Sequence, residues 1–321
     1  MADKPSRGLV VYGDGLAGIV SPSHAHLHSL ASRGSCGFLA LKDYPRTESD
    51  DERVVWELAQ LLDAHNAFIG SKGGNAATFE NQNKPLIPTI SERFMGMKAA
   101  IFTTNARVRS FGRNLGFTAL QFDELIDDNI SLNNTPQNIL SSKLLKLLGF
   151  EEGKTMERGD FDLVIVHIGH GDKENELQKK ILSDEVEWIN ALVGGFFQMP
   201  QLASEVGSRI LFYLVMSYGT VSDDGDPSLS NFISQKETDS DLSSLIPLQS
   251  YTMKAGELLS DIRHHCPMLC AQWQEAVTRK DMAEVFSFNE FKERGGNLAI
   301  PADRFLYELA FKLWKAPKYG A

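Results

Sequence analysis

Residues 8–41 constrain the fold of this chain most strongly. They contain two apolar runs, and a loop with an acidic residue follows the first run. The first run, Leu9–Tyr12, leads directly into the loop Gly13–Gly15, which carries Asp14, and a second run, Phe38–Leu41, closes the unit. Apolar runs of this length are typical of buried strands. Ligands of open α/β sheets gather outside the carboxyl ends of parallel strands. The pattern therefore predicts an α/β sheet with Asp14 at the tip of a central strand, where chemistry is expected.

One interpretation of this loop is a dinucleotide site. Residues Gly13–Gly18 fit the pattern G-x-G-x-x-G directly after a strand, and Asp43 follows the second strand at about the distance of a ribose-binding carboxylate. Pro22 argues against this interpretation, because it lacks a backbone donor and prevents a helix from starting at the glycines and aiming its dipole at a pyrophosphate. A Rossmann-type NAD(P) or FAD oxidoreductase stays open as an alternative, but we expect no dinucleotide binding.

The other interpretation takes Asp14 as a metal ligand and starts the helix later, in residues 24–34. Gly34 suits the end of such a helix. One apolar stripe at helical spacing supports it, made of Leu27, Leu30 and Ala31. The stretch also contains three histidines at alternating positions, His24, His26 and His28. Alternating positions point around a helix and not to one side, so we expect surface or structural histidines.

With Asp-Gly followed by a helix that ends in a leucine, a small residue and a glycine, this opening resembles the alkaline phosphatase superfamily. A second segment narrows the resemblance. The strand Lys98–Thr104 leads into Asn105–Phe117, which closely resembles the cofactor-independent phosphoglycerate mutases, particularly their archaeal-type branch. The resemblance implies that Arg109 and Arg113 hold the phosphate of a substrate, and guanidinium groups match phosphate oxygens well. A solvated basic face that includes Arg107 is the alternative.

Ser49 lies three residues before Glu52, which opens a helix predicted over Glu52–Ala64. The spacing forms a capping box, so Ser49 is adequately explained as an N-cap. The resemblance adds a second interpretation, since this superfamily holds its nucleophile at a helix N-terminus and Ser49-Asp50 is similar to the Ser-Asp of the mutase branch. Acidic neighbours such as Asp50 would repel a phosphate unless metal ions cancelled their charge.

The metal-ligand motifs depart from those of the family. After the strand Leu163–Ile168, Asp172 matches a ligand aspartate, but Glu176 stands where the family has a histidine. A carboxylate can still bind a divalent cation. The strand Arg209–Met216 ends in Ser217–Gly219, with sequence Ser-Tyr-Gly where the family has Asp-His-Gly. Serine is a poor ligand and tyrosine would have to ionise, so most of the second metal cage is missing. A later histidine of the family has no counterpart before His264.

Composition excludes several classes of protein. The chain of 321 residues is 42% hydrophobic, enough for a substantial core, and carries a formal net charge of -10. An acidic chain is poorly suited to nucleic acid or anionic membranes. No apolar run approaches the roughly 18 residues needed to span a bilayer, and Met1–Arg7 is too short for a signal peptide, so we expect a cytoplasmic protein with neither nucleic-acid nor membrane partners. Three cysteines cannot pair completely, and Cys266–Cys270 lacks a second pair for zinc.

The C-terminal part shows helical periodicity in Met253–Ile262, Ala271–Phe286 and Ala302–Trp314, without a motif of chemical meaning. The resemblance covers Gly8 to about Met253. We therefore predict a single alkaline phosphatase-like α/β domain over residues 1–321, with a mainly parallel sheet, helices on both faces, and a C-terminal helical extension over 254–321.

Three function classes follow. The first is a phosphoglycerate-mutase-like protein that has lost two-metal catalysis and binds a protein partner or a phosphorylated small molecule. The second is an active phosphoesterase or phosphomutase that uses manganese or zinc, with Ser49 as the nucleophile. In it the resemblance implies metal ligands Asp14, Asp172 and Glu176, and phosphate contacts Arg109 and Arg113. The third is the Rossmann-type oxidoreductase. The missing ligands favour the first class, because a two-metal mechanism needs both charges, so we expect no catalysis and no required cofactor.

Overall fold

A computed structural model describes most of the chain. The described residues are 5–43, 50–65, 68, 88–125, 137–151, 153–156, 159–169, 176–203, 205–219, 240–245, 253–254, 257–258, 261–295 and 299–317.

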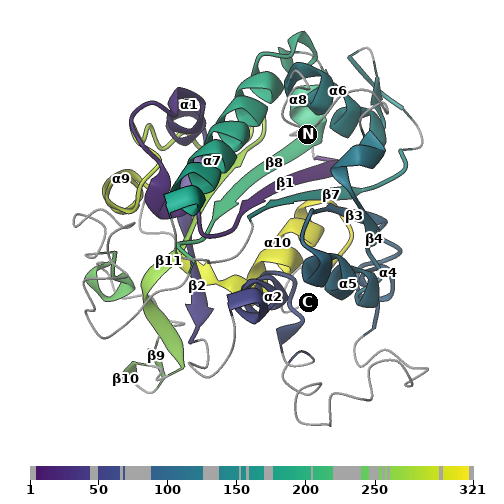
Figure 1. Cartoon of the computed structure of the whole chain (residues 1–321). Coiled ribbons are helices and arrows are strands. Elements are labelled where there is room, and N and C mark those ends of the chain that lie inside the picture. The colour runs from purple at the N-terminus through teal and green to yellow at the C-terminus, as the bar shows by residue number, and fades with distance from the viewer. Residues whose placement is uncertain are drawn as a thin grey trace.

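The centre of the molecule is an eight-stranded sheet in the order β12-β2-β11-β8-β1-β7-β3-β4 (Figure 1). Its strands are β1 (Arg7–Gly13), β2 (Ser35–Lys42), β3 (Ala99–Phe102), β4 (Thr118–Leu120), β7 (Leu163–Ile168), β8 (Ile210–Met216), β11 (Ile262–Trp273) and β12 (Ala299–Pro301). All neighbours pair in parallel except β11, which is antiparallel to both β2 and β8. The mainly parallel sheet with β1 near its middle confirms the prediction from the sequence.

Helices cover both faces of this sheet, because successive residues of each buried strand point to opposite faces. Leu9 and Val11 of β1 pack in one apolar cluster, and Val10 and Tyr12 pack in the other. The first cluster includes residues of α1 (Ala25–Arg33), α6 (Gln137–Leu147), α7 (Glu176–Phe197) and α9 (Phe288–Arg294). The second includes residues of α2 (Asp50–Leu61), α4 (Ile90–Arg93), α5 (Ala106–Asn114) and α10 (Phe305–Lys312). The two layers of helices are therefore those predicted.

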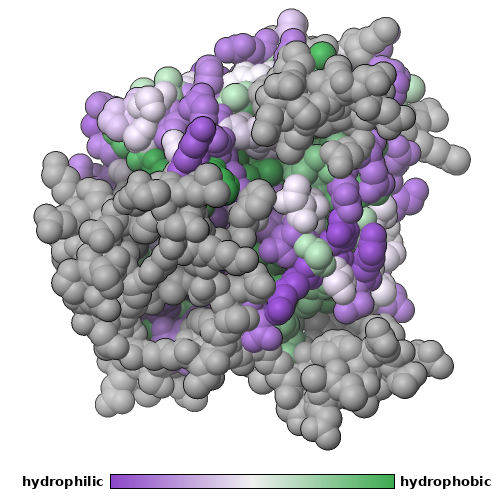
Figure 2. Space-filling model, viewed as in Figure 1, coloured by the Kyte–Doolittle hydropathy of each residue, from purple (hydrophilic) through white to green (hydrophobic). Residues whose placement is uncertain are grey.

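Smaller elements complete the described chain. These are α8 (Glu205–Arg209), the strand pair β5 (Phe150–Glu151) and β6 (Lys154–Thr155), and the strand pair β9 (Met253–Lys254) and β10 (Glu257–Leu258). Among the described residues, no helix is long and apolar enough to cross a membrane. On the face shown in Figure 2, most of the described surface is hydrophilic, and hydrophobic residues show in small areas only.

The segment after β1 confirms that a helix does not start at the glycines. Ala17–Ile19 form a single 3-10 turn, and α1 begins at Ala25, beyond Pro22. The helix ends at Gly34, as predicted, but for a different reason. Gly34 has an extended backbone and not a left-handed one. A Cβ at this position would lie 2.7 Å from the carbonyl oxygen of Gln272, so the close approach of β11 requires glycine here.

The predicted helices over Met253–Ile262 and Ala271–Phe286 are wrong, and the C-terminal segment is not purely helical. The first stretch contains β9, β10 and the first residue of β11, and Ala271–Trp273 of the second form the end of β11, while residues 274–286 form turns, bends and irregular structure. Strand β11 is inserted into the central sheet between β2 and β8. A strand buried on both faces has no alternation of polar and apolar residues, so periodicity does not separate it from a helix. The helix predicted over Ala302–Trp314 is confirmed by a 3-10 turn and α10.

Candidate functional site

Asp14 lies at the carboxyl end of β1, where the two neighbouring strands also end. Its backbone N–H donates to the carbonyl of Ile168 at the end of β7, and the N–H of Ser217, after β8, donates to the carbonyl of Gly13. The backbone approaches Asp14 closely at Gly169, where a Cβ would lie 2.8 Å from the Cβ of Asp14 and φ is +150°. Three strand ends therefore meet around one aspartate that is only 2% exposed.

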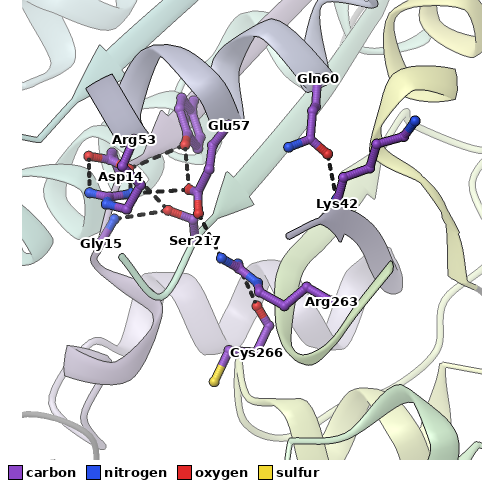
Figure 3. A network of polar contacts seen from close by, with 10 residues as sticks. Asp14, Gly15, Lys42, Arg53, Glu57, Gln60, Ser217, Arg263 and Cys266 are labelled. Atoms are coloured by element: carbon purple, nitrogen blue, oxygen red, sulfur yellow. Dashed lines mark hydrogen bonds and ion pairs between the residues drawn. The ribbon is translucent and has the colours of Figure 1, made fainter. Parts of the chain in front are cut away.

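The carboxylate of Asp14 is held by a guanidinium group. Arg53 of α2 donates from Nη1 to Oδ1 at 2.9 Å and from Nη2 to Oδ2 at 3.1 Å (Figure 3). Both side chains are almost completely buried, at 2% exposure for Arg53 and 1% for Asp14. Paired bonds of this kind are among the stronger hydrogen bonds in proteins, and here they engage both oxygens of Asp14.

Glu57 and Arg263 extend this ion pair into a network. Arg53 Nη1 also lies 3.2 Å from Glu57 Oε2, one helical turn along α2. On the other side of Glu57, Arg263 Nη1 lies 3.1 Å from Oε1, and Arg263 Nη2 donates to the carbonyl of Cys266 at 3.0 Å. The network therefore contains two carboxylates and two guanidinium groups, so its formal charges cancel. Burial of charge is tolerated when the groups are paired and hydrogen-bonded in this way.

The environment of the network sets the ionisation of its members. Burial alone would raise the pKa of the Asp14 carboxyl, but the charge and hydrogen bonds of Arg53, together with smaller contributions from His167 and Ser217, lower it overall. Burial raises the pKa of Tyr12 well above its ordinary value, and the charges of Asp14 and Glu57 raise it further. The Tyr12 hydroxyl therefore stays protonated, 3.3 Å from an oxygen of each carboxylate.

Ser217 acts as a hydrogen-bond partner of Asp14. Its hydroxyl donates to Asp14 Oδ1 at 3.2 Å and accepts from the N–H of Gly15 at 3.0 Å. Tyr218, the next residue, is buried at 5% exposure. Where the resemblance places a ligand aspartate, this chain has a neutral hydroxyl that shares the carboxylate of Asp14 with Arg53.

His167 lies beside this network on β7. It is paired in register with Tyr12, and the two rings are 5.5 Å apart between centroids. Its Nδ1 is 2.8 Å from the hydroxyl oxygen of Thr103, which also accepts from the N–H of Asn105. Since that oxygen already accepts a bond, the Thr103 hydroxyl is suited to donate to Nδ1. This contact joins the ends of β7 and β3 at the site.

The two arginines predicted to hold phosphate lie on α5, which runs back from the carboxyl end of β3. Asn105 caps the start of α5 by accepting from the N–H groups of Arg107 and Val108. Arg109, one turn into the helix, is half-buried, and Arg113, in the last turn, is exposed. Because the helix leads away from the carboxyl edge of the sheet, Arg109 lies nearer to that edge than Arg113. Their contact with phosphate stays a prediction.

Ser49 and Asp172 fall outside the described residues. Glu176 is the first residue of α7, but its side chain is likewise outside the described part. The roles predicted for these three residues therefore stay predictions. Among the residues that the structure describes, no group of three or more histidine, cysteine, aspartate or glutamate side chains is arranged to hold a metal ion. The described part of the site does not suit a divalent cation at Asp14, because the Arg53 guanidinium binds both carboxylate oxygens and its positive charge would repel the cation.

Sequence reasoning missed Arg53, Glu57 and Arg263. The only local signal was the i, i+4 spacing of Arg53 and Glu57, which is typical of ion pairs on exposed helix surfaces. That spacing gave no indication that the pair is buried against Asp14.

Comparisons with known proteins found similar solved structures, all at low sequence identity. No family model matches this sequence, and no curated protein matches it. The PH0037 protein from Pyrococcus horikoshii is similar in structure with a TM-score of 0.55, at 14% identity, over 100% of each chain. The lipoteichoic acid synthase LtaP from Listeria monocytogenes matches with a TM-score of 0.52, at 12% identity, over 99% of this chain and 74% of that one. A protein in the alkaline phosphatase superfamily from Vibrio parahaemolyticus matches with a TM-score of 0.45, at 9% identity, over 86% of this chain and 61% of that one.

The first two structures are similar to this chain over all or nearly all of its length, and the predicted α/β class with a mainly parallel sheet is confirmed by the strand pairing of the structure itself. At these identities the likeness concerns the fold alone.

Proposed function

We propose that this protein acts by binding a ligand or a partner, without two-metal catalysis, and that Arg53 takes the position in which the resemblance puts a metal ion at Asp14. The observation that carries this proposal is the buried, two-bonded ion pair of Asp14 and Arg53. A divalent cation would have to displace a guanidinium group that satisfies both oxygens of Asp14. The displaced charge would then lack its partner inside the protein, which is strongly unfavourable.

The charge of the network supports the same proposal. Glu57 is held by Arg53 on one side and by Arg263 on the other. The two arginines therefore supply the positive charge that balances both buried carboxylates. Ser217 completes the arrangement as a neutral donor to Asp14. A network that is neutral without a metal ion gives such an ion little electrostatic attraction.

The ligand class that we propose is a phosphorylated small acid, held by Arg109. This arginine is half-buried near the start of α5, and among the described residues it makes no ion pair. A hydrogen bond between charged groups contributes roughly 1.5 to 3 kcal/mol. A phosphorylated three-carbon acid is the class suggested by the resemblance to phosphoglycerate mutases.

Metal analysis tests the first part of the proposal. After dialysis, the purified protein should hold less than one equivalent of manganese or zinc, and it should show no phosphatase or mutase activity when either metal is added. Arg53→Ala, which frees the Asp14 carboxylate, should gain metal affinity relative to the parent. Two equivalents retained by the parent, or metal-dependent turnover lost in Ser49→Ala, would support the active phosphoesterase or phosphomutase instead.

A thermal-shift panel tests the ligand. A ligand at 100 times its dissociation constant adds about 2.7 kcal/mol to stability, so phosphorylated three-carbon acids should raise the melting temperature. Arg109→Ala should abolish the shift, and Arg113→Ala shows whether the second arginine contributes. Arg294→Ala, on α9 and paired with Glu290, is the control and should respond like the parent. If no phosphorylated acid shifts the melting temperature, the phosphate site is refuted, and a protein partner should be sought by co-purification.

A further inference from the structure

Two histidines at the start of α1 accept hydrogen bonds from backbone N–H groups. The N–H of Phe286 donates to His28 Nδ1 at 3.1 Å, and His28 Nε2 lies 3.0 Å from the carbonyl oxygen of Ser21. A backbone N–H can only donate, so Nδ1 must be unprotonated. The single ring proton then lies on Nε2, where it meets the carbonyl of Ser21. Both contacts are satisfied by one neutral tautomer of His28.

His24 repeats this arrangement one turn earlier. The N–H of Ser21 donates to His24 Nδ1 at 2.9 Å, and His24 Nε2 lies 3.7 Å from Glu187 on α7. The side chain is buried, and burial lowers its pKa, although the charge of Glu187 opposes the shift. Ser21 therefore binds both rings, through its N–H to His24 and through its carbonyl to His28.

The residue held by His28 belongs to the core. Phe286 is 1% exposed, and its ring lies 5.0 Å from that of Phe291 in α9. The chain just before it presents apolar side chains to solvent, with Met282 at 58% and Val285 at 40% exposure. The hydrogen bond to His28 thus fastens the end of a partly exposed apolar segment to α1.

We propose that His24 and His28 form a pH-sensitive latch, which holds residues 282–287 against α1 while both rings are neutral and releases them on protonation. A second proton on His28 would set its Nδ1–H against the N–H of Phe286. A second proton on His24 would likewise set its Nδ1–H against the N–H of Ser21. Each contact then changes from a hydrogen bond into a repulsion. Mild acid should therefore loosen residues 282–287 and uncover the ring of Phe286.

Within the described part of the chain, no charged group near the two rings stabilises the positive charge that a second proton would place on His28. Glu187 of α7 faces His24, and His24 is the titratable neighbour of His28 on its own helix. In the segment opposite, the Glu284 carboxylate is paired with Arg294 at 3.3 Å, and the Glu284 N–H is bound by Glu290. Among the residues that the structure describes, no carboxylate pairs with His28. Its protonated form therefore loses the hydrogen bond from the backbone N–H of Phe286 without gaining an ion pair.

Amide hydrogen exchange tests the latch in the full chain. The protection factor of the Phe286 amide, corrected for the intrinsic dependence of exchange on pH, should fall about tenfold between pH 7.5 and pH 5.0, since one hydrogen bond is worth about 1.4 kcal/mol. In His28→Asn the side-chain oxygen still accepts from Phe286 but does not titrate, so protection should stay constant over this range. His265→Asn, at an exposed histidine that pairs with Asp241 and not with Phe286, should behave like the parent.

Either of two exchange results would overturn the latch. One is a Phe286 protection factor in the parent that is equal at both pH values, and the other is a fall in His28→Asn as large as that in the parent. If His28→Asn does not fold, the side-chain nitrogen resonances of His28 in the parent give the answer. They should report a neutral ring protonated on Nε2 at pH 7.5, and the opposite neutral tautomer would refute the proposal.

Discussion

Replacing Arg53 with methionine should destabilise the protein strongly, because it removes one cation from a buried and otherwise neutral network. Methionine keeps an unbranched apolar stem but ends before the guanidinium group, so Asp14 loses two hydrogen bonds, at 2.9 and 3.1 Å, together with the positive charge. Glu57 keeps its contact with Arg263. The network is left with one uncompensated negative charge. Removing one partner of a buried ion pair destabilises proteins by about 3 to 5 kcal/mol, and we expect a loss of this size at pH 7.5.

The size of this loss should depend on pH. In the parent the pKa of Asp14 is lowered, so the stability from its ionised form is present above the unfolded-state pKa and is lost as the pH falls through the folded-state value. Without Arg53, burial should raise the pKa of Asp14, and the folded variant should take up a proton more readily than the unfolded chain. Between pH 7.5 and pH 4.5 the contribution of Asp14 to the stability of the parent should change little, because this range lies above the unfolded-state pKa. The variant gains stability by taking up a proton over the same range, so the difference between the two proteins should shrink.

Urea unfolding of four proteins measures these effects: the parent, Arg53→Met, Asp14→Asn and the double variant. The double variant has no unpaired charge at Asp14 and should be more stable than Arg53→Met. Arg294→Met is the matched control, since its partner Glu284 is 77% exposed and an exposed ion pair contributes about 0 to 1 kcal/mol. A loss below about 1 kcal/mol in Arg53→Met, or a loss that does not change with pH, would refute the view that this pair replaces a metal ion.

Three further predictions concern other parts of the chain. Gly194→Val should destabilise by about 1 to 3 kcal/mol in urea unfolding, because a Cβ there would lie 2.5 Å from the ring of His26. Burial raises the pKa of the Cys270 thiol to about 12, so mass spectrometry should find it unmodified after native protein is treated with iodoacetamide at pH 8. Since burial lowers the pKa of His24, the folded state stays neutral while the unfolded chain takes up a proton, and stability should fall as the pH drops below the unfolded-state value of about 6.5. His24→Asn should reduce that dependence in melting temperatures measured between pH 7.5 and 5.5, and an unchanged slope would contradict it.

The elements that the sequence alone predicts are those with a strong local pattern. The buried run of β7 was predicted over the same residues, Leu163–Ile168, that form it. Pro22 indicated correctly that α1 begins after the glycine loop. The position of Asp14 followed from the central strand that precedes it, since β1 lies between β7 and β8. Hydrophobic periodicity and backbone restrictions act over a few neighbouring residues, so they can be recognised without knowledge of the tertiary fold.

Only the tertiary structure decided the chemistry at Asp14. Arg53 is 39 residues away in the sequence, and Arg263 reaches the same network from β11, a strand that the sequence did not predict. The spacing of Arg53 and Glu57 is the same in an exposed helix and in this buried one. Whether such a pair is solvated or holds Asp14 depends on which surfaces the folded sheet brings together. Because the interaction of charges depends on distance in space and on burial, no local pattern could show that a guanidinium group occupies both oxygens of Asp14.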